Sequence, residues 1–266
     1  MTEAPDRHGQ LVQPRLAEMV AGILRTRIIE GELADGDRLP KQDDLLAEFG
    51  VSRPSIREAM RILETEGLVS VRRGNVGGAE VHAPDPRNAA YMLGLVMQSQ
   101  HVTLTDVASA LRILEPAAAS LCASRTDRIT TVLPELRRLN AEAEAQLEDG
   151  PAFTRIARHW HATMVESCGN RTMILVVGTL ETVWSHHELL WADHIAARGE
   201  YPDVKSRRLV LRAHVDITDA IEAGNEESAH RVARRHLDES QTYLLAKDPH
   251  ARVNITGSPQ QFDTFR

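Results

Sequence analysis

Residues 51–69, VSRPSIREAMRILETEGLV, decide how the first third of the chain is interpreted. Ser52 is a good N-cap, and Pro54 falls in the first helical turn, where the N–H that proline lacks is not needed. Gly67 ends the helix that these two residues begin. The apolar side of this helix consists of Ile56, Ala59, Met60 and Leu63. The stretch therefore predicts a short amphipathic helix with a turn at each end.

Three arginines lie on the other side of this helix. Arg53, Arg57 and Arg61 recur at every fourth position in a chain of 266 residues with a formal net charge of −7. Asp and Glu outnumber Lys and Arg even within residues 1–80, so this region as a whole is not basic. Two interpretations stay open: a solvated helix face with salt bridges to nearby glutamates, or a helix that enters a groove of DNA. The second depends on a few locally placed contacts, because a general positive surface is missing.

The elements on either side of this helix favour the second interpretation. We expect helices at 15–30 and about 42–49 before it, and short strands at 68–71 and 79–82 after it, joined by a glycine-rich tip at 72–78. Helix, helix, tight turn, helix and β-hairpin is the order of a winged helix-turn-helix. The start of the third helix of that motif faces the base edges in the major groove.

This placement predicts which residues contact double-stranded DNA. Arg53, Ser55 and Arg57 occupy the start of the helix, and an arginine that reaches guanine is the commonest specific contact. Arg61 lies one turn further along, nearer a phosphate. The hairpin tip supplies the other candidates, Arg72, Arg73 and Gly74.

Four short motifs occur at fixed intervals in this region: Leu39-Pro40, Val51-Ser-Arg53, Arg57-Glu-Ala59 and Glu66-Gly-Leu68. Together they resemble the N-terminal domain of the GntR family of bacterial transcription regulators, over about residues 15–82. The resemblance implies a DNA-binding domain.

The resemblance also assigns residues. It implies base contacts by Arg53 and Arg57 and wing contacts near Arg73 and Gly74. The sequence departs from the family where members often carry an arginine that touches DNA, because Asp43 stands at that position. We expect this contact to be lost, with Lys41 as a partial substitute.

From about residue 88 onward the sequence contains only helical patterns. The expected helices lie at 88–100, 104–125, 131–148, 152–168, 172–197, 204–223 and 226–247. The fold class is therefore mainly α, a winged helix-turn-helix followed by an all-helical bundle. The expected divisions are a disordered N-terminal arm at 1–14, the DNA-binding domain at 15–82, a linker at 83–88, an all-helical effector-binding and dimerisation domain at 89–247, and a flexible tail at 248–266.

Several local features of the helical half occur in a characteristic order. They are Arg112-Ile-Leu-Glu115, Trp160-His161 followed by Gly169-Asn170, then His214 and His236. This order resembles the FCD domain, the ligand-binding domain of FadR-type members of the GntR family, over about residues 88–245.

The resemblance implies a divalent metal held by His161, His214 and His236 together with an aspartate one turn before the first histidine. Imidazole ligands suit Zn, Ni or Fe. The position of the aspartate is taken by Ala157, so the anionic ligand is missing and metal binding should be weaker. The alternative is that the three histidines line a polar pocket and hydrogen-bond the effector directly.

Arg112 is the predicted partner of an effector carboxylate, because a guanidinium pairs with a carboxylate through two hydrogen bonds. The alternative is a salt bridge from Arg112 to Glu115 or Glu181. The apolar run at 92–97 is a candidate for core or dimer interface, or for a site that admits a lipid-like chain.

These features predict a transcription regulator, most simply a repressor, whose operator affinity is controlled by a small-molecule effector such as a carboxylic acid. A homodimer would present two recognition helices to a near-palindromic operator. The alternatives are a metal-responsive regulator, a lipid- or acyl-responsive regulator, and a metal-dependent enzyme that uses His161, His214 and His236 with a DNA-binding adaptor. The enzyme is disfavoured because the sequence has no nucleophile motif, glycine-rich phosphate loop or HExxH.

No window of the sequence approaches 18 uninterrupted apolar residues, and the first residues lack the apolar core of a secretory signal. We therefore expect a cytoplasmic protein with no membrane partner.

Overall fold

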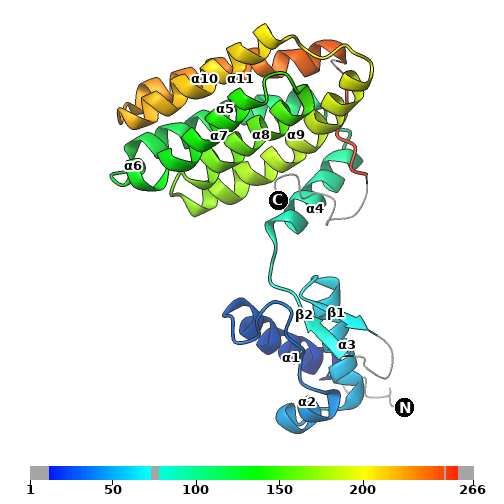
Figure 1. Cartoon of the computed structure of the whole chain (residues 1–266). Coiled ribbons are helices and arrows are strands. Elements are labelled where there is room, and N and C mark those ends of the chain that lie inside the picture. Colours follow the sequence, from blue (N-terminus) through cyan, green and yellow to red (C-terminus); the bar gives the residue numbers. More distant parts are fainter. Residues whose placement is uncertain (1–11, 73–77, 249, 257–266) are drawn as a thin grey trace, which may run out of the picture. The chain divides into compact units, whose positions relative to one another are not determined.

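The computed structural model describes residues 12–72, 78–248 and 250–256, and it divides the chain into two compact units, residues 1–85 and 86–266 (Figure 1). The elements of the first unit are α1 (Val12–Ile29), α2 (Gln42–Phe49), α3 (Arg53–Thr65), β1 (Val69–Arg72) and β2 (Gly78–Val81). The two strands pair antiparallel, with Val69 opposite Val81. This is the predicted winged helix-turn-helix.

The turn between α2 and α3 is fixed by two local signals. Gly50 ends α2 with a φ of +62° and donates its N–H to Leu46 O at 3.0 Å. Ser52 begins α3, because its hydroxyl accepts the N–H of Ser55. The helix then packs its apolar side on α1 and on the hairpin, where the buried residues include Leu24, Ile56, Leu63 and Val81.

One feature of the first unit was not expected. The chain before α2 runs beside β2, where Leu39 N donates to Ala79 O at 2.9 Å and Val81 N donates to Asp37 O at 2.8 Å. This pairing covers the outer edge of β2 and holds the start of the helix-turn-helix against the hairpin.

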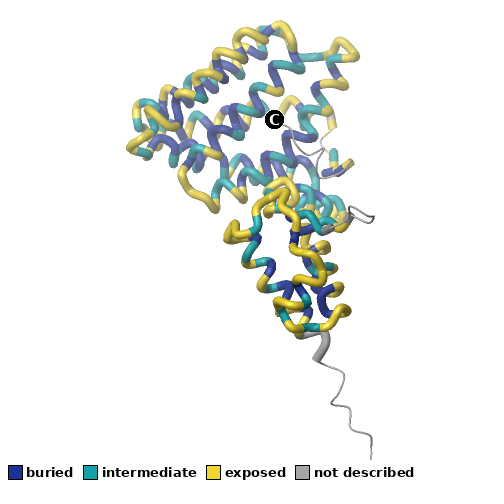
Figure 2. The backbone as a smooth tube through the Cα atoms, turned by 60° about the horizontal axis from the view of Figure 1, so that its bottom comes forward, coloured by how far each residue is buried: buried dark blue, intermediate teal, exposed yellow. Residues whose placement is uncertain are grey.

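The described part of the second unit is a helical bundle, as predicted. Its helices are α4 (Pro86–Ser99), α5 (Leu104–Ser124), α6 (Arg128–Thr131), α7 (Leu133–Ala145), α8 (Gly150–Glu166), α9 (Arg171–Ala197), α10 (Val204–Glu222) and α11 (Glu226–Lys247). The short α6 was not predicted, and α4 begins inside the expected linker at 83–88. The long helices lie side by side in Figure 1, with α5 packed on α11, α8 on α9, and α10 on both α7 and α11. Their buried sides face one another (Figure 2), so functional groups inside the bundle are shielded from water.

Within the tail expected at 248–266, residues 250–256 are described by the structure and lie against the bundle. Val253 and Ile255 are buried, and Ala251 O accepts the N–H of Leu104 at 2.8 Å. Both side chains belong to the hydrophobic core of the second unit, and their burial stabilises the position of this segment. Residues 257–266 lie outside the described residues, as do residues 1–11 of the predicted N-terminal arm.

Candidate functional site

The predicted DNA-reading arginines lie along one exposed side of α3. Arg53 pairs with Asp43 at 3.0 Å, and Arg61 pairs with Glu58 at 3.4 Å. Within the described residues, Arg57 forms no ion pair. Arg57 is therefore the arginine of this stripe whose guanidinium is available without breaking another contact.

Ser55 does not belong to this exposed side, contrary to the prediction. Only 1% of its surface is exposed, and its hydroxyl lies 3.0 Å from that of Ser52. The hydroxyl is used in the cap that begins α3, so it is not free to contact a base. Arg72 ends β1, but its side chain lies outside the described part of the chain, as do Arg73 and Gly74.

The surface beside α3 carries two further cations. A hollow there is lined by Arg38 and Lys41 together with Arg57 and Arg61. Lys41 was expected to take over part of a lost DNA contact, whereas Arg38 was not singled out. Its position in a turn-rich connection gave no helical spacing to mark it.

The three histidines predicted to bind a metal come together inside the second unit. The Nε2 atom of His214 lies 3.2 Å from that of His161 and 3.1 Å from that of His236, and the remaining pair is 3.2 Å apart. They come from α8, α10 and α11, and α10 packs on both of the others. All three are almost completely buried.

These residues fit a divalent metal. Two nitrogens bound to one zinc ion at about 2.0–2.1 Å in tetrahedral geometry lie about 3.3 Å apart, close to the separations in this cluster. Burial lowers the pKa of each imidazole well below its usual range, and the neutral imidazole is the form that binds metal. The cluster contains no carboxylate among the described residues, consistent with Ala157 at the position expected for the aspartate.

Groups behind the histidines hold their orientation. The Nδ1 atom of His161 is hydrogen-bonded to the buried carboxyl of Glu115, and a ligating histidine commonly donates its second N–H to a carboxylate. The ring of His214 stacks on Trp160 with centroids 4.2 Å apart. The sequence had marked Glu115 only as a possible salt-bridge partner of Arg112, because its distance to His161 depends on how α5 packs on α8.

A buried arginine provides positive charge next to the histidines. Arg158 lies one turn before His161 on α8, and its guanidinium is 3.3 Å from Glu188 and 3.5 Å from Glu181. Burial alone would lower the pKa of Arg158, but the carboxylates of Glu188, Glu181 and Glu115 outweigh it and raise the pKa. Arg158 is thus charged in the interior of the bundle.

Two of these carboxyls are in an unusual state. Burial raises the pKa of Glu181 well above its usual range, and the nearby Glu115 raises it further. Burial also raises the pKa of Glu115. Neither oxygen of Glu181 has a hydrogen-bond partner within the described residues, although the guanidinium of Arg158 lies 3.5 Å away.

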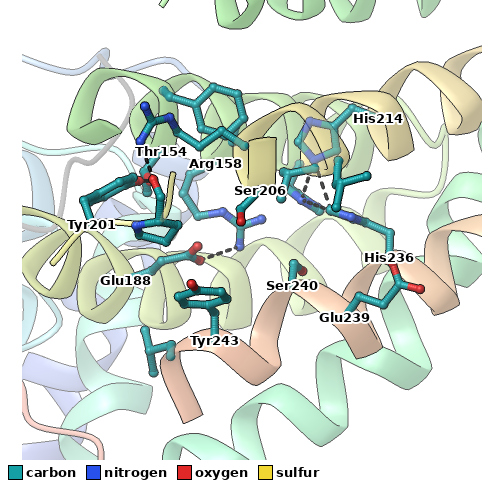
Figure 3. Close-up of a pocket in the computed structure, with 18 of the residues that line it drawn as sticks. Thr154, Arg158, Glu188, Tyr201, Ser206, His214, His236, Glu239, Ser240 and Tyr243 are labelled. Carbon is teal, nitrogen blue, oxygen red and sulfur yellow. Dashed lines mark hydrogen bonds and ion pairs between the residues drawn. The ribbon is translucent and has the colours of Figure 1, made fainter. Parts of the chain in front are cut away.

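The histidines and Arg158 open into a cavity of about 250 Å³. Figure 3 shows Arg158 reaching toward Glu188, with Tyr201 and Tyr243 on the side of the cavity away from His214. Its other polar lining comes from Thr154, Ser206, Arg207, Glu239 and Ser240, and Phe153 and Trp191 add two further aromatic rings. The cavity therefore combines cations, carboxylates and hydroxyls with aromatic walls, as ligand sites generally do.

Arg112, the predicted partner of an effector carboxylate, is not among the residues that line this cavity. Its guanidinium lies 3.7 Å from Asp238 and 3.3 Å from the hydroxyl of Ser109. The arginine that the fold brings to the histidines is Arg158. The three-residue spacing to His161 on one helix face was the available sequence signal for it.

A winged helix-turn-helix joined to a helical domain with an internal polar cavity is the organisation of a DNA-binding transcription regulator with a ligand-binding domain. The family described as "Bacterial regulatory proteins, gntR family" matches residues 16–77, and the FCD domain matches residues 106–239. The chain belongs to the GntR family of transcription regulators that carry an FCD domain.

Individual proteins agree with this assignment. The HTH-type transcriptional repressor NanR of Salmonella schwarzengrund (strain CVM19633) is 28% identical over 246 residues, which cover 87% of this chain and 85% of that protein. NanR of Cronobacter sakazakii (strain ATCC BAA-894) is 28% identical over 242 residues, covering 86% and 85%. The solved structure of a Streptococcus agalactiae GntR protein has the same fold, with a TM-score of 0.65 and 23% identity over 85% of this chain and 99% of that one. The chain is thus a regulator and not an enzyme.

Within the described residues, no helix combines the length and the apolar character that crossing a bilayer requires.

Proposed function

We propose that this regulator is a repressor and that a small carboxylic acid, bound in the cavity of the second unit, controls its affinity for the operator. The observation that carries the proposal is the meeting of the three-histidine cluster and Arg158 in one cavity. Arg158 attracts an anion directly, and the neutral histidines would do so through a bound metal. Both lie in a buried site, where such attraction is strong.

Arg158 is the better candidate than Arg112 for the carboxylate of the acid. Its guanidinium is buried and pairs with Glu188 and Glu181. Both Arg158 and Glu188 line the cavity, so a ligand in the cavity can reach this ion pair. An acid that approaches Arg158 competes with Glu188 for its N–H groups. The Arg158–Glu188 ion pair would then be weaker in the acid-bound state than in the free state. An effector can shift a protein between two conformations only if it interacts differently with each of them.

We assign His161, His214 and His236 as the residues that hold a divalent metal, with zinc, nickel and iron as the candidates. Because its protein ligands are neutral, the metal would supply positive charge that the cavity otherwise lacks at that end. Glu115 fixes the ring of His161 from behind. A metal-responsive regulator is the second candidate function, favoured by the three imidazole nitrogens that lie within 3.2 Å of one another.

The cavity lining argues against the lipid- or acyl-responsive alternative. Hydroxyl groups of Thr154, Tyr201 and Ser240 face the cavity, together with the carboxylate of Glu188. The hydroxyls of Thr154 and Tyr201 are hydrogen-bonded to each other, but a long acyl chain would still exclude water from Ser240 and from the charged Glu188, which is costly. The apolar run at 92–97, considered for such a chain, lies on α4 and contributes no residue to the cavity.

A homodimer on a near-palindromic operator is part of the proposal. Large apolar side chains are exposed on α4, where Met92 is 57% and Val96 47% exposed, and on α9, where Leu175 is 54% exposed. These two helices pack on each other, so a second copy of the chain could cover both. The named relatives are repressors, which supports repression as the mode of action.

The decisive experiment measures operator binding under defined ligands. The full-length protein first selects its operator from random-sequence duplex DNA, and its affinity for that operator is then measured with EDTA, with zinc, and with zinc plus gluconate, citrate or hexanoate. We expect an acid to lower operator affinity, and we expect the metal alone to have a smaller effect. Arg158→Lys keeps the charge but removes the paired N–H groups, so it should weaken the response to the acid.

The outcomes separate the candidates. Release by zinc alone, with no further effect of any acid, supports the metal-responsive regulator. Release by hexanoate but not by gluconate or citrate supports the acyl-responsive one. If Arg158→Lys responds to the acid as the unaltered protein does, Arg158 is not its partner.

A further inference from the structure

The chain after α11 returns to the start of the bundle and pairs with the turn between α4 and α5. Leu104 N donates to Ala251 O at 2.8 Å, and Val253 N donates to Val102 O at 2.9 Å. Thr103 and Arg252 thus face each other in an antiparallel bridge. Residues 251–256, here called the strap, are held to this turn by their backbone.

The strap also binds two helices through side chains. The amide oxygen of Gln98, on α4, accepts the N–H of Ile255 at 2.9 Å. The Nε2 atom of His187, on α9, accepts the N–H of Asn254 at 2.9 Å. Because α4 and α9 each supply an acceptor, the strap ties the two helices together.

Packing at Gly94 makes this contact specific. A Cβ atom at Gly94 would lie 2.6 Å from Cδ1 and 2.7 Å from Cγ1 of Ile255, so with any larger residue the Ile255 side chain or the strap itself must shift. Gly94 has an ordinary helical backbone, and its small size is needed only for Ile255. Gly178, on α9, offers a contrast, because a Cβ atom there would meet nothing within 4 Å.

The strap touches the same turn of α9 that borders the cavity. His187, which holds the strap, precedes Glu188, which lines the cavity and pairs with Arg158 at 3.3 Å. The indole of Trp184 donates to Glu188 at 2.6 Å, so this turn is fixed from the cavity side as well. One turn of α9 therefore has the cavity on one side and the strap on the other.

We propose that the strap holds α4 on α9, and that it makes the position of α4 depend on the turn of α9 at Glu188. α4 is the first helix after the DNA-binding unit, which ends at residue 85. Loss of the strap is therefore expected to free α4 and to lower operator affinity while the cavity stays intact. The dependence of α4 on the turn at Glu188 rests on the proposed function, because it assumes that the cavity binds the effector. The effect of the strap on operator affinity does not, because DNA binding follows from the family.

The test compares Gly94→Ala with Gly178→Ala in the full-length protein. Both changes replace a helical glycine by alanine and bring the same gain in helix propensity, but only the first collides with Ile255. For Gly94→Ala we expect amide hydrogen exchange in α4 and in residues 251–256 to rise about tenfold, and affinity for the selected operator to fall about fivefold or more. Exchange in α8 and α11 should stay unchanged, and Gly178→Ala should match the unaltered protein.

A second change checks that the collision is the cause. Ile255→Ala removes the side chain that Gly94 accommodates, so the double variant with Gly94→Ala should regain part of the lost protection and affinity relative to Gly94→Ala alone. Two substitutions at Gln98 give an independent measure. Gln98→Leu removes both the acceptor for Ile255 and the donor to Asn254, whereas Gln98→Glu removes only the donor. We expect the leucine variant to resemble Gly94→Ala and the glutamate variant to lie closer to the unaltered protein.

The proposal is overturned if Gly94→Ala and Gln98→Leu expose α4 yet leave operator affinity unchanged, or if they behave like Gly178→Ala. If Gly94→Ala loses protection throughout the bundle, including α8 and α11, the variant has disturbed the whole fold. The comparison of Gln98→Leu with Gln98→Glu then tests the proposal. Failure of every acid to release the operator would instead contradict the proposed effector, and it would leave these strap measurements interpretable.

Discussion

The functional arginines of the two units lie in opposite environments, exposed in the first unit and buried in the second. The arginines of α3 are exposed, follow one another on a single helix, and have at most one carboxylate partner each within the described residues. Arg158 is buried, and its partners Glu181 and Glu188 belong to a different helix. An exposed charge keeps its hydration, so it can be placed by local sequence alone, whereas a buried charge needs partners that only the tertiary fold can provide.

The largest effect should come from removing a histidine of the buried cluster. His236→Ala takes away one of the three proposed ligands, and we expect zinc affinity to fall by at least about a hundredfold, beyond the range typical of residues that only support a ligand. His230→Ala, on the exposed side of the same helix, is the matched control and should bind zinc normally. Zinc content after dialysis and titration with a competing chelator measure the difference.

This comparison tests the buried site directly. Equal zinc binding by His236→Ala and His230→Ala would mean that the cluster is not the metal site. The three histidines would then be polar groups of the cavity, which was the alternative open from the sequence.

An intermediate effect is expected on the exposed site. Arg57→Ala should lower affinity for the selected operator by about 1–3 kcal/mol and relax the preference at one base pair, because a paired arginine–guanine contact discriminates by that amount. Arg61→Ala should instead weaken binding to all sequences alike, as expected for a phosphate contact. A footprint and sequence preference unchanged in Arg57→Ala would contradict its role as a base reader.

The same contrast explains what the sequence could predict. The winged helix-turn-helix and the helices of the bundle follow from caps, glycines and apolar periodicity, all of which act over a few residues. The histidine trio was found only through the resemblance to a family, because His161, His214 and His236 are far apart in the chain. Their meeting within 3.2 Å depends on the packing of α8, α10 and α11.

The details that the sequence did not predict depend on tertiary contacts. Arg112 has the chemistry to bind a carboxylate, but the fold places it beside Asp238, and Arg158 reaches the cavity. Ser55 was assigned to DNA from its position in the helix, yet its hydroxyl turned inward to the cap. The tail at 250–256 looked loose because its partners, Gln98 and His187, lie more than sixty residues away.

The smallest predicted effect lies where the exposed site departs from the family pattern. Asp43 pairs with Arg53 at 3.0 Å, and both side chains are largely exposed, so the ion pair itself is worth only about 0.2–1 kcal/mol. Asp43→Asn frees Arg53 and removes a negative charge near the phosphates, so operator affinity should rise about two- to fivefold at low salt. Asp44→Asn is the matched control, because it changes the net charge equally without touching this pair.

Salt dependence then separates the two causes. If Asp43 acts through general repulsion of DNA, Asp43→Asn and Asp44→Asn should raise affinity alike, and both gains should fade as salt is added. If Asp43 acts by holding Arg53 away from its base, the gain of Asp43→Asn should exceed that of Asp44→Asn and should disappear in Arg53→Ala. The second result would mean that even on an exposed helix one neighbouring carboxylate tunes which arginine reads the sequence.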